Sequence, residues 1–357
     1  MTEKSALIAM SGGVDSAVAA LMMKEAGYRC VGATMRLYEL EDHGCGGEKT
    51  CCSLEDVEDA RAVAFRLGIP FYVFNFKEDF SRQVMDRFVR AYEGGQTPNP
   101  CIDCNRFLKF DRMYRRAMEL GLDKVVTGHY ARIRQSPDGR WQLLKGPDPQ
   151  KDQSYVLYTM TQEQLAHTIF PLGHLRKEEV RAIAEANGFI NAKKRDSQDI
   201  CFVPDGDYAA FIRSRTGKDY PAGNFVDSEG NVLGQHRGII HYTIGQRRGL
   251  GVSGGRPLYV QEIRPEDNTV VLTENLGLFT SRLIARDFNW VSIPEPAETI
   301  HVRARARYHH PEQPAKVTVL PGGAVEIIFE TPQRALTRGQ SVVLYDGDMV
   351  LGGGIIE

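Results

Sequence analysis

The sequence lacks a hydrophobic run of the roughly 20 residues that a membrane helix needs. It also lacks a secretory signal, because the opening residues MTEKSALIAM contain neither a charged n-region nor a cleavage site of small residues. Charge of one sign is missing too, since 44 Lys and Arg stand against 46 Asp and Glu, for a net charge of −2. We therefore expect a cytoplasmic protein without membrane contact, in which any nucleic-acid site requires basic residues grouped on one face.

Cysteine is scarce, with seven residues in a chain of 357. An odd number without an export signal argues against a disulfide scaffold and directs attention to thiol chemistry or metal binding. Cys30 falls in a strand-like run and is expected in the core, and a glycine-rich segment holds Cys45, Cys51 and Cys52. A GxxxxGK[ST] motif is also absent, which excludes a P-loop kinase or GTPase.

Short apolar runs alternate with amphipathic segments in the first part of the chain. We predict strands at residues 6–10, 30–35, 70–76 and 124–129, and helices that begin near Val14, Leu54, Phe80 and Phe107. Such alternation is typical of a parallel sheet covered by helices on both faces. The expected fold class of this part is α/β.

The end of the chain has a different pattern. HVRARARY, AKVTVL, AVEIIF and SVVLYD alternate polar and apolar residues between turn sequences, which predicts a small antiparallel β-barrel. Because 357 residues exceed what one core usually serves, we expect three domains: the α/β domain (1–205), a small linking domain (206–278) and the barrel (279–357). Within the barrel, Arg303, Arg305 and Arg307 share one strand face and are expected to form part of an RNA track.

The hexapeptide SGGVDS at residues 11–16 lies between the first expected strand and the first expected helix. Its two glycines permit a tight turn, and the helix N-terminus supplies free N–H groups, so a phosphate group fits there. Asp15 offers a carboxylate for Mg²⁺ on the phosphates. This arrangement predicts a nucleotide site.

Three cysteines stand in polar surroundings. In TPNPCIDCN (97–105) two prolines are expected to fix an extended loop that presents Cys101 and Cys104, and DSQDICF (196–202) contains Cys201. Three thiols beside a nucleotide loop indicate sulfur transfer. Two mechanisms remain open, a cysteine persulfide or a 4Fe-4S cluster held by Cys101, Cys104 and Cys201, whereas closed structural zinc lacks a fourth nearby cysteine.

The hexapeptide resembles the PP-loop of ATP pyrophosphatases, which are adenine nucleotide alpha hydrolase-like proteins. Together, SGGVDS, CCSLEDVEDAR, TPNPCIDCN, TGHYAR, KDQSYVLY, DSQDICF and TIGQRRGLG resemble the series of motifs in bacterial tRNA-specific 2-thiouridylases. The resemblance implies ATP and Mg²⁺ as cofactors. It implies the wobble uridine of tRNAs for Lys, Glu and Gln as the substrate, bound through the anticodon stem-loop.

The resemblance also implies roles for individual residues. Cys104 corresponds to the nucleophile, and Cys201 to the residue that receives a persulfide from a cysteine desulfurase or a sulfur-relay protein, with a Cys104–Cys201 disulfide as a product. Many family members carry Asp where this chain has Cys101. The implied ATP contacts are Ala9, Met10, Ser11, Gly12, Gly13, Val14, Asp15, Ser16, Met35 and Gly128. The implied tRNA contacts are Asn99, Pro100, Cys101, His129, Lys151, Asp152, Gln153, Arg307, Tyr308 and Gln340.

Two other functions are consistent with parts of this pattern. A PP-loop ligase that forms amides or transfers sulfur on a small molecule would turn over ATP without RNA and tolerate loss of Cys104. An RNA-binding or iron–sulfur carrier protein with a vestigial ATP loop would bind tRNA regardless of Asp15.

Overall fold

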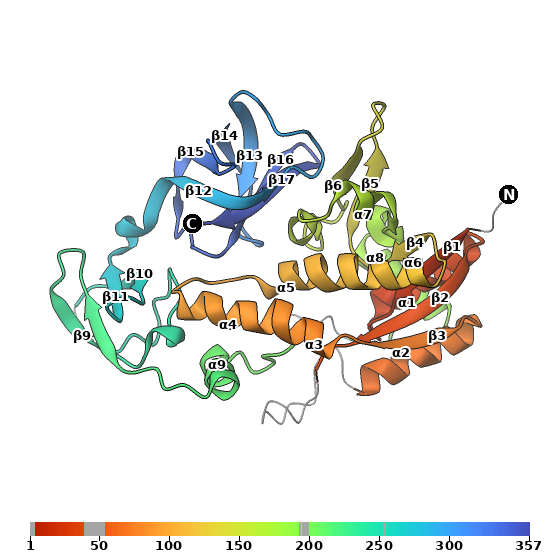
Figure 1. Cartoon of the computed structure of the whole chain (residues 1–357), viewed down its shortest axis with the longest axis horizontal. Coiled ribbons are helices and arrows are strands. Elements are labelled where there is room, and N and C mark those ends of the chain that lie inside the picture. Colours follow the sequence, from red (N-terminus) through yellow and green to blue (C-terminus); the bar gives the residue numbers. More distant parts are fainter. Residues whose placement is uncertain (1–3, 39–53, 193, 195–199, 253–254) are drawn as a thin grey trace.

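The computed structural model describes residues 4–38, 54–192, 194, 200–252 and 255–357 (Figure 1). Cys45, Cys51 and Cys52, and the residues 196–199 that precede Cys201 in its motif, lie outside the described residues. Among those described, no helix is long and apolar enough to cross a bilayer.

The N-terminal domain is built on a five-stranded parallel sheet with the order β3-β2-β1-β4-β7. The four predicted strands are present, with ends that differ by up to three residues, and β7 was not predicted. The strands are β1 (Ser5–Ala9), β2 (Arg29–Arg36), β3 (Phe71–Asn75), β4 (Lys124–Val126) and β7 (Thr168–Ile169). This confirms the α/β fold class.

Alternate side chains of these strands enter two cores. On one face, Ala6 and Ile8 pack under α1 (Val14–Glu25), α2 (Leu54–Leu67) and α8 (Lys177–Ala186). On the other face, Leu7 belongs to a second cluster, which we call the lower core. The lower core continues into α9 (Tyr208–Thr216) and the middle sheet, so the first two domains share it. Its helices are α3 (Lys77–Phe80), the π-helical η2 (Ser81–Met85), α4 (Asp86–Glu93), the π-helical η3 (Cys104–Arg112) and α6 (Met113–Glu119).

The prediction of an extended loop ending at the two cysteines was wrong. The chain is already helical at Pro100, through α5 (Pro100–Asp103) and directly into η3. The Asn99 side chain accepts a hydrogen bond from the Cys101 N–H at 3.1 Å, and proline occupies the first helical position. Asn followed by Pro is a helix start signal, because the side chain caps a free N–H and proline needs none. Cys104 therefore stands inside a helix.

The middle of the chain forms a four-stranded sheet with the order β10-β11-β8-β9. Its strands are β8 (Gly223–Val226), β9 (Val232–His236), β10 (Tyr259–Arg264) and β11 (Thr269–Thr273). Short turns of 3-10 helix, η6 (Ile239–His241) and η7 (Asn275–Leu278), accompany them.

The C-terminal domain is a closed antiparallel β-barrel, as predicted. Its strands follow the order β12-β15-β14-β13-β16-β17, and pairing of β12 with β17 closes it. Four strands were predicted from the sequence, β13 (Ile300–Arg305), β14 (Gln313–Val319), β15 (Val325–Arg334) and β16 (Ser341–Asp346). Two strands were not predicted, β12 (Phe279–Asn289) and β17 (Met349–Ile356).

A hairpin from the first domain extends the barrel sheet. β5 (Ala131–Gln135) pairs with β6 (Trp141–Lys145), and β6 pairs with β17 at Leu144 and Met349. In Figure 1 the barrel lies above α4 and α5, beside this hairpin. The remaining elements of this region are η4 (Ser154–Leu157), α7 (Gln162–Ala166) and η5 (Pro171–His174). The barrel is thus joined to the first domain by backbone hydrogen bonds.

Candidate active site

The glycine turn lies at a switch point of the parallel sheet. β1 pairs with β2 on one side and with β4 on the other, and the chain visits β2 and β3 before it returns to β4. Open α/β sheets bind ligands at the carboxyl ends of such a strand pair. A Cβ atom on Gly128, just after β4, would lie 2.8 Å from the carbonyl carbon of Asp15. The two predicted parts of the nucleotide site are therefore in contact.

The turn is tightly held by its surroundings. Gly12 has φ +76°, and a Cβ atom there would lie 2.4 Å from the Asp56 carbonyl oxygen, so only glycine fits. The buried Asn191 amide donates to the Gly12 carbonyl oxygen at 3.0 Å. The Ser16 hydroxyl donates to the Gly13 carbonyl oxygen at 3.0 Å and accepts from the Ser11 N–H at 3.2 Å. The backbone of the turn is thus held in place before any ligand binds.

Asp15 is the centre of a charged cluster at the start of α1. The Lys177 ammonium donates to both Asp15 carboxylate oxygens at 2.8 Å, and the Tyr130 hydroxyl donates to one of them at 2.6 Å. The Lys177 ammonium also lies 5.7 Å from the centre of the Tyr130 ring. We name Asp15, Lys177 and Tyr130 the turn cluster. A carboxylate in this position suits Mg²⁺, and the lysine suits phosphate.

Sequence reasoning missed Lys177, Tyr130 and Asn191. Lys177 did leave a signal, because it is the first residue of α8, and a cation at a helix N-terminus opposes the helix dipole. Such a placement requires a compensating anion, which is Asp15. Tyr130 and Asn191 carry no comparable sequence pattern.

The other predicted nucleotide residues fall into two groups. Met10 and Val14 are core residues, 2% and 3% exposed, so a ligand can reach only their backbone. Ala9 and Met35 are half-buried and pack at the edge of the lower core. They are therefore closer to the open side of the site.

Cys104 and Cys201, the two predicted reactive cysteines, also contact the lower core. Both are half-buried and pack against the lower core, as Ala9 and Met35 do. The Tyr38 hydroxyl, two residues beyond β2, donates to the Cys201 carbonyl oxygen at 2.6 Å. Cys201 thus lies near the carboxyl end of β2, the sheet edge that also carries the glycine turn, and Cys104 packs against the same core.

Cys101 is exposed and differs from the other two. Burial raises the pKa of the neighbouring Tyr308 hydroxyl to about 12, and the Cys101 thiol adds a smaller electrostatic contribution in the same direction. Among the described residues, no three His, Cys, Asp or Glu side chains gather as metal ligands.

Asp103, between the two cysteines, carries a half-buried carboxyl group. Burial raises its pKa from the ordinary value, although Arg87, 3.3 Å away, and Arg106 oppose the shift. Its side chain thus orders arginines next to the helix that carries Cys104.

Predicted RNA contacts from distant parts of the chain meet where the barrel faces the cysteine helix. The Gln340 amide donates to the Thr97 carbonyl oxygen at 2.7 Å, and the Thr97 N–H donates to the Arg338 carbonyl oxygen at 2.8 Å. The Tyr308 hydroxyl donates to the Asp152 carbonyl oxygen at 3.1 Å. The segments 97–101, 151–153, 307–308 and 338–340 are therefore held together.

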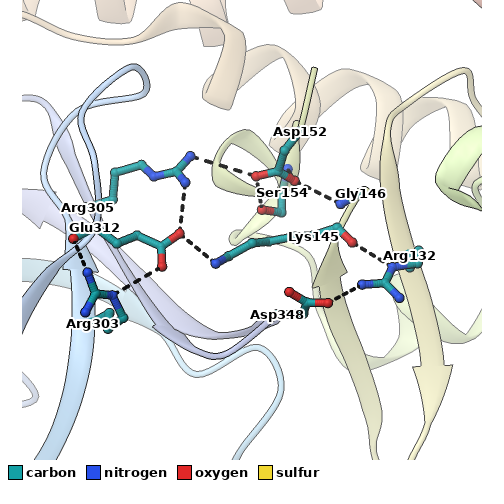
Figure 2. A network of polar contacts seen from close by, with 9 residues as sticks. All are labelled: Arg132, Lys145, Gly146, Asp152, Ser154, Arg303, Arg305, Glu312 and Asp348. Atoms are coloured by element: carbon teal, nitrogen blue, oxygen red, sulfur yellow. Dashed lines mark hydrogen bonds and ion pairs between the residues drawn. The ribbon is translucent and has the colours of Figure 1, made fainter. Parts of the chain in front are cut away.

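Asp152 and its neighbours form the network drawn in Figure 2, which we name the barrel network. Glu312 pairs with Lys145 at 2.7 Å and with Arg305 at 2.9 Å. Arg305 also approaches Asp152 at 3.8 Å, and the Asp152 carboxylate accepts hydrogen bonds from Gly146 and Ser154. The network contains residues of both the hairpin and the barrel, so it joins the two domains.

The predicted arginine row has a different environment from the one expected. Arg303 and Arg305 both contact Glu312; Arg305 is largely enclosed, whereas Arg303 remains exposed. Arg307 donates to the carbonyl oxygens of Ile244 at 3.3 Å and Ala335 at 3.0 Å, and also to the Thr337 hydroxyl. Arg305, through Asp152, and Arg307, through Ile244, thus link domains, whereas Arg303 contacts only the barrel.

His129 is also less accessible than an RNA contact would need. Its side chain is 6% exposed, packs near Phe110 and Phe170, and shares a 2.6 Å hydrogen bond with the Thr127 hydroxyl. Burial holds its pKa well below the ordinary value. Direct contact with RNA would require its neighbours to move.

Comparison with known families identifies the class of the fold first. Residues 4–205 match the family model described as a tRNA methyl transferase HUP domain, 209–274 match a tRNA methyl transferase PRC-barrel domain, and 280–356 match an aminomethyltransferase beta-barrel domain. The chain is thus a three-part protein of the HUP class.

Full-length relatives then identify the family. The chain is 50% identical over 354 residues to the protein named tRNA-specific 2-thiouridylase MnmA from Lachnoclostridium phytofermentans, covering 99% of both chains. It is 49% identical to the protein of that name from Clostridioides difficile, covering 99% of this chain and 98% of the other, and 50% identical to that from Acetivibrio thermocellus, covering 100% of both. The chain belongs to the tRNA-specific 2-thiouridylase family, which confirms the resemblance seen in its motifs.

Proposed function

We propose that this protein synthesises 2-thiouridine in tRNA, using ATP to activate the C2 carbonyl oxygen of the wobble uridine. AMP is transferred to that oxygen and pyrophosphate leaves. Sulfur then attacks C2, and AMP departs with the original oxygen. The observation that carries this proposal is the hydrogen bond from Tyr38 to the Cys201 carbonyl oxygen, which places Cys201 near the carboxyl end of β2, with Cys104 packed against the same core.

The turn cluster supports the activation step. The turn backbone and the N-terminus of α1 suit the phosphates, and Lys177 can neutralise charge that develops on pyrophosphate. Mg²⁺ fits beside Asp15 because carboxylate oxygen is its preferred protein ligand. Bound there, the ion would offset phosphate charge.

For the sulfur step we propose a persulfide on Cys201, loaded by a cysteine desulfurase or a sulfur-relay protein. The Cys104 thiolate attacks the inner sulfur of this persulfide, which forms a Cys104–Cys201 disulfide and releases hydrosulfide. Hydrosulfide attacks C2 of the adenylated uridine; alternatively the outer persulfide sulfur attacks first and Cys104 then frees the product. In both routes an external thiol reductant must restore the two thiols.

A 4Fe-4S cluster receives less support from the described residues. Cys101 is exposed, whereas Cys104 and Cys201 are half-buried and pack against the lower core. Three cysteine ligands of one cluster would have to converge. We therefore place the sulfur on a persulfide and assign Cys101 to the RNA side.

We further propose that the anticodon stem-loop of tRNAs for Lys, Glu and Gln binds across the barrel and the cysteine helix, with the wobble base turned out of its stack. The RNA would contact Asn99, Pro100, Cys101, Lys151, Gln153, Tyr308 and Gln340 there. His129 and Arg307 would contact it only after their side chains rearrange. Residues 1–205, 206–278 and 279–357 would be the working units, in the cytoplasm. The family-model ranges support this division.

The test is reconstitution with ATP, Mg²⁺, cysteine, a cysteine desulfurase, a thiol reductant and unmodified tRNA, followed by mass spectrometry of the nucleosides. We expect 2-thiouridine at the wobble position with one AMP released per modification. Cys104→Ser and Cys201→Ser should abolish the product, and Cys30→Ala is the matched control because Cys30 belongs to the opposite core.

Three outcomes would contradict the proposal or a part of it. AMP release without RNA, with Cys104→Ser still active, would indicate a small-molecule ligase. RNA binding without pyrophosphate release, unchanged in Asp15→Ala, would indicate a carrier protein. Loss of activity in Cys101→Ala, together with iron bound to the anaerobically purified protein, would favour the 4Fe-4S mechanism over the persulfide mechanism.

A further inference from the structure

A cavity of about 280 Å³ lies where α4 and the cysteine helix face the barrel. One wall holds Arg87, Arg90 and Arg106, and Gly339 and Ser341 of the barrel form part of the other wall. Asn99 and Asp103 also line it. The cavity therefore adjoins the helix of Cys104 without including either reactive cysteine.

Two of the three arginines are held by carboxylates. Arg87 donates to Asp103 at 3.3 Å, and Arg106 forms an ion pair with Asp287. Both guanidinium groups also lie near the Phe107 ring, at 5.1 Å and 5.2 Å from its centre. They are thus oriented before any ligand arrives.

Arg90 is exposed and has no ion-pair partner in the described parts of the chain. Three arginines therefore face two carboxylates, and one positive charge remains. This surplus equals the charge of one phosphodiester group. Guanidinium is also the side chain best suited to phosphate, because its planar donors match the oxygens.

Thr159 supplies a second, independent observation. It lines the cavity and is 8% exposed, and its hydroxyl oxygen has no hydrogen-bond partner within the described structure. A buried polar group without a partner costs free energy, and a ligand oxygen would remove that cost. A hydroxyl beside surplus positive charge suits an anionic oxygen.

We propose that this cavity binds one backbone phosphate of the substrate RNA, next to the nucleotide that enters the active site. The inference rests on the proposed function, because it takes RNA as the substrate. Arg90 supplies the charge, Thr159 donates a hydrogen bond, and the paired Arg87 and Arg106 shape the site. A base is a poorer occupant, since the aromatic lining residue Tyr158 is buried, with its hydroxyl bonded to Ser341.

The test is the salt dependence of tRNA binding to the full-length protein without ATP. Losing one phosphate contact reduces the slope of log Kd against log salt by about 0.7 to 0.9, and we expect this for Arg90→Ala with roughly tenfold weaker binding. Arg90→Lys should retain the slope, since it keeps the charge. Thr159→Val should weaken binding about threefold at an unchanged slope, because it removes only a neutral donor.

The matched control is Arg61→Ala, an exposed arginine of α2 on the opposite face of the sheet, which should change neither quantity. An unchanged slope in Arg90→Ala overturns the proposal, and weaker binding at an unchanged slope would assign the cavity to an uncharged part of the RNA. Formation of 2-thiouridine by the unmodified protein is measured separately, so failure of the phosphate site is distinguishable from failure of the proposed function.

Discussion

The turn cluster and the barrel network are both built from carboxylates and cations, but they differ in how completely each carboxylate is enclosed. The Asp15 side chain remains 30% exposed, and Lys177 is its cation. The Glu312 side chain is 11% exposed and has contacts with Lys145, Arg303 and Arg305. A ligand can therefore exchange partners at Asp15, whereas the pairs around Glu312 are already complete.

This difference separates a binding site from a joint. A carboxylate with one lysine at a sheet switch point can accept a metal ion while the lysine moves to a phosphate, because both ions keep a partner. At Glu312 any exchange would leave a half-buried cation without a partner, which is costly. We infer that the first cluster changes during turnover and that the second fixes the barrel in place.

The largest effect should come from Lys177→Met, which preserves length and removes charge. Losing an oriented cation at developing charge costs about 100- to 1000-fold in turnover. We expect kcat for 2-thiouridine formation and for pyrophosphate release to fall together, with tRNA affinity unchanged. Steady-state kinetics and filter binding measure these quantities.

Lys177→Arg is the control for that experiment, because it keeps the charge, and it should retain more activity than Lys177→Met. If both variants lose only thermal stability and kcat is normal in the folded fraction, Lys177 is merely a structural partner of Asp15. The turn cluster would then resemble the barrel network, and the distinction between them would fail.

Glu312→Gln should have the next largest effect, on stability. It leaves Lys145 and Arg305 facing each other without their shared anion, and we expect a loss of about 2 kcal/mol, below the 3–5 kcal/mol of a fully buried pair since these groups are partly exposed. Denaturant unfolding measures it. ATP binding should be unaffected.

Glu330→Gln, on the exposed side of β15, is the matched control and should be neutral. The double variant with Lys145→Met and Glu312→Gln should lose less free energy of unfolding than the two single variants lose together, because Glu312→Gln alone already breaks the pair. Full additivity would show that the two side chains do not interact.

The nucleotide half of the site was predictable because its signal is local. The glycines, Asp15 and the start of α1 are consecutive in the sequence, and turn geometry and helix dipole act over that same distance. The strands around it were found for a similar reason, since their apolar runs reflect burial. The prediction of an extended loop at Cys101 was wrong, although the helix start signal there, Asn99 before Pro100, was also local.

The interface half was not predictable in the same way. The backbone pairing of β6 with β17 and the contact of Lys145 with Glu312 connect residues more than 150 positions apart, and no period or motif encodes them. The sequence of the arginine row shows its strand face but not the Glu312 carboxylate opposite it, so the ion pairs of Arg303 and Arg305 were not predicted. Lys177 was partly predictable. A lysine at a helix start indicates that an anion lies nearby, but the sequence does not show that this anion is Asp15.

His129 gives a smaller effect, which appears in the pH dependence of stability. Its pKa is lowered by burial, so the unfolded chain binds a proton that the folded chain does not. Stability is then complete above about pH 6.5 and is lost as pH falls, by up to about 1.4 kcal/mol per pH unit. His129→Gln should flatten this loss, measured by denaturant unfolding between pH 7 and 5, while the exposed His174→Gln should not.

The smallest effect is expected for Gln340→Ala, and it distinguishes two roles of one residue. The Gln340 amide holds the loop before Cys101 through a 2.7 Å hydrogen bond to Thr97, so its loss should cost about 1 kcal/mol of stability and raise KM for tRNA about threefold. Gln333→Ala, which loses only contacts within β15, is the control. Weaker tRNA binding at unchanged stability would instead mean that Gln340 contacts only the RNA. Its hydrogen bond to Thr97 would then contribute nothing to holding the barrel against the cysteine helix. A fall in both quantities would place Gln340 with Glu312, as part of the joint that holds the RNA surface against the reactive thiols.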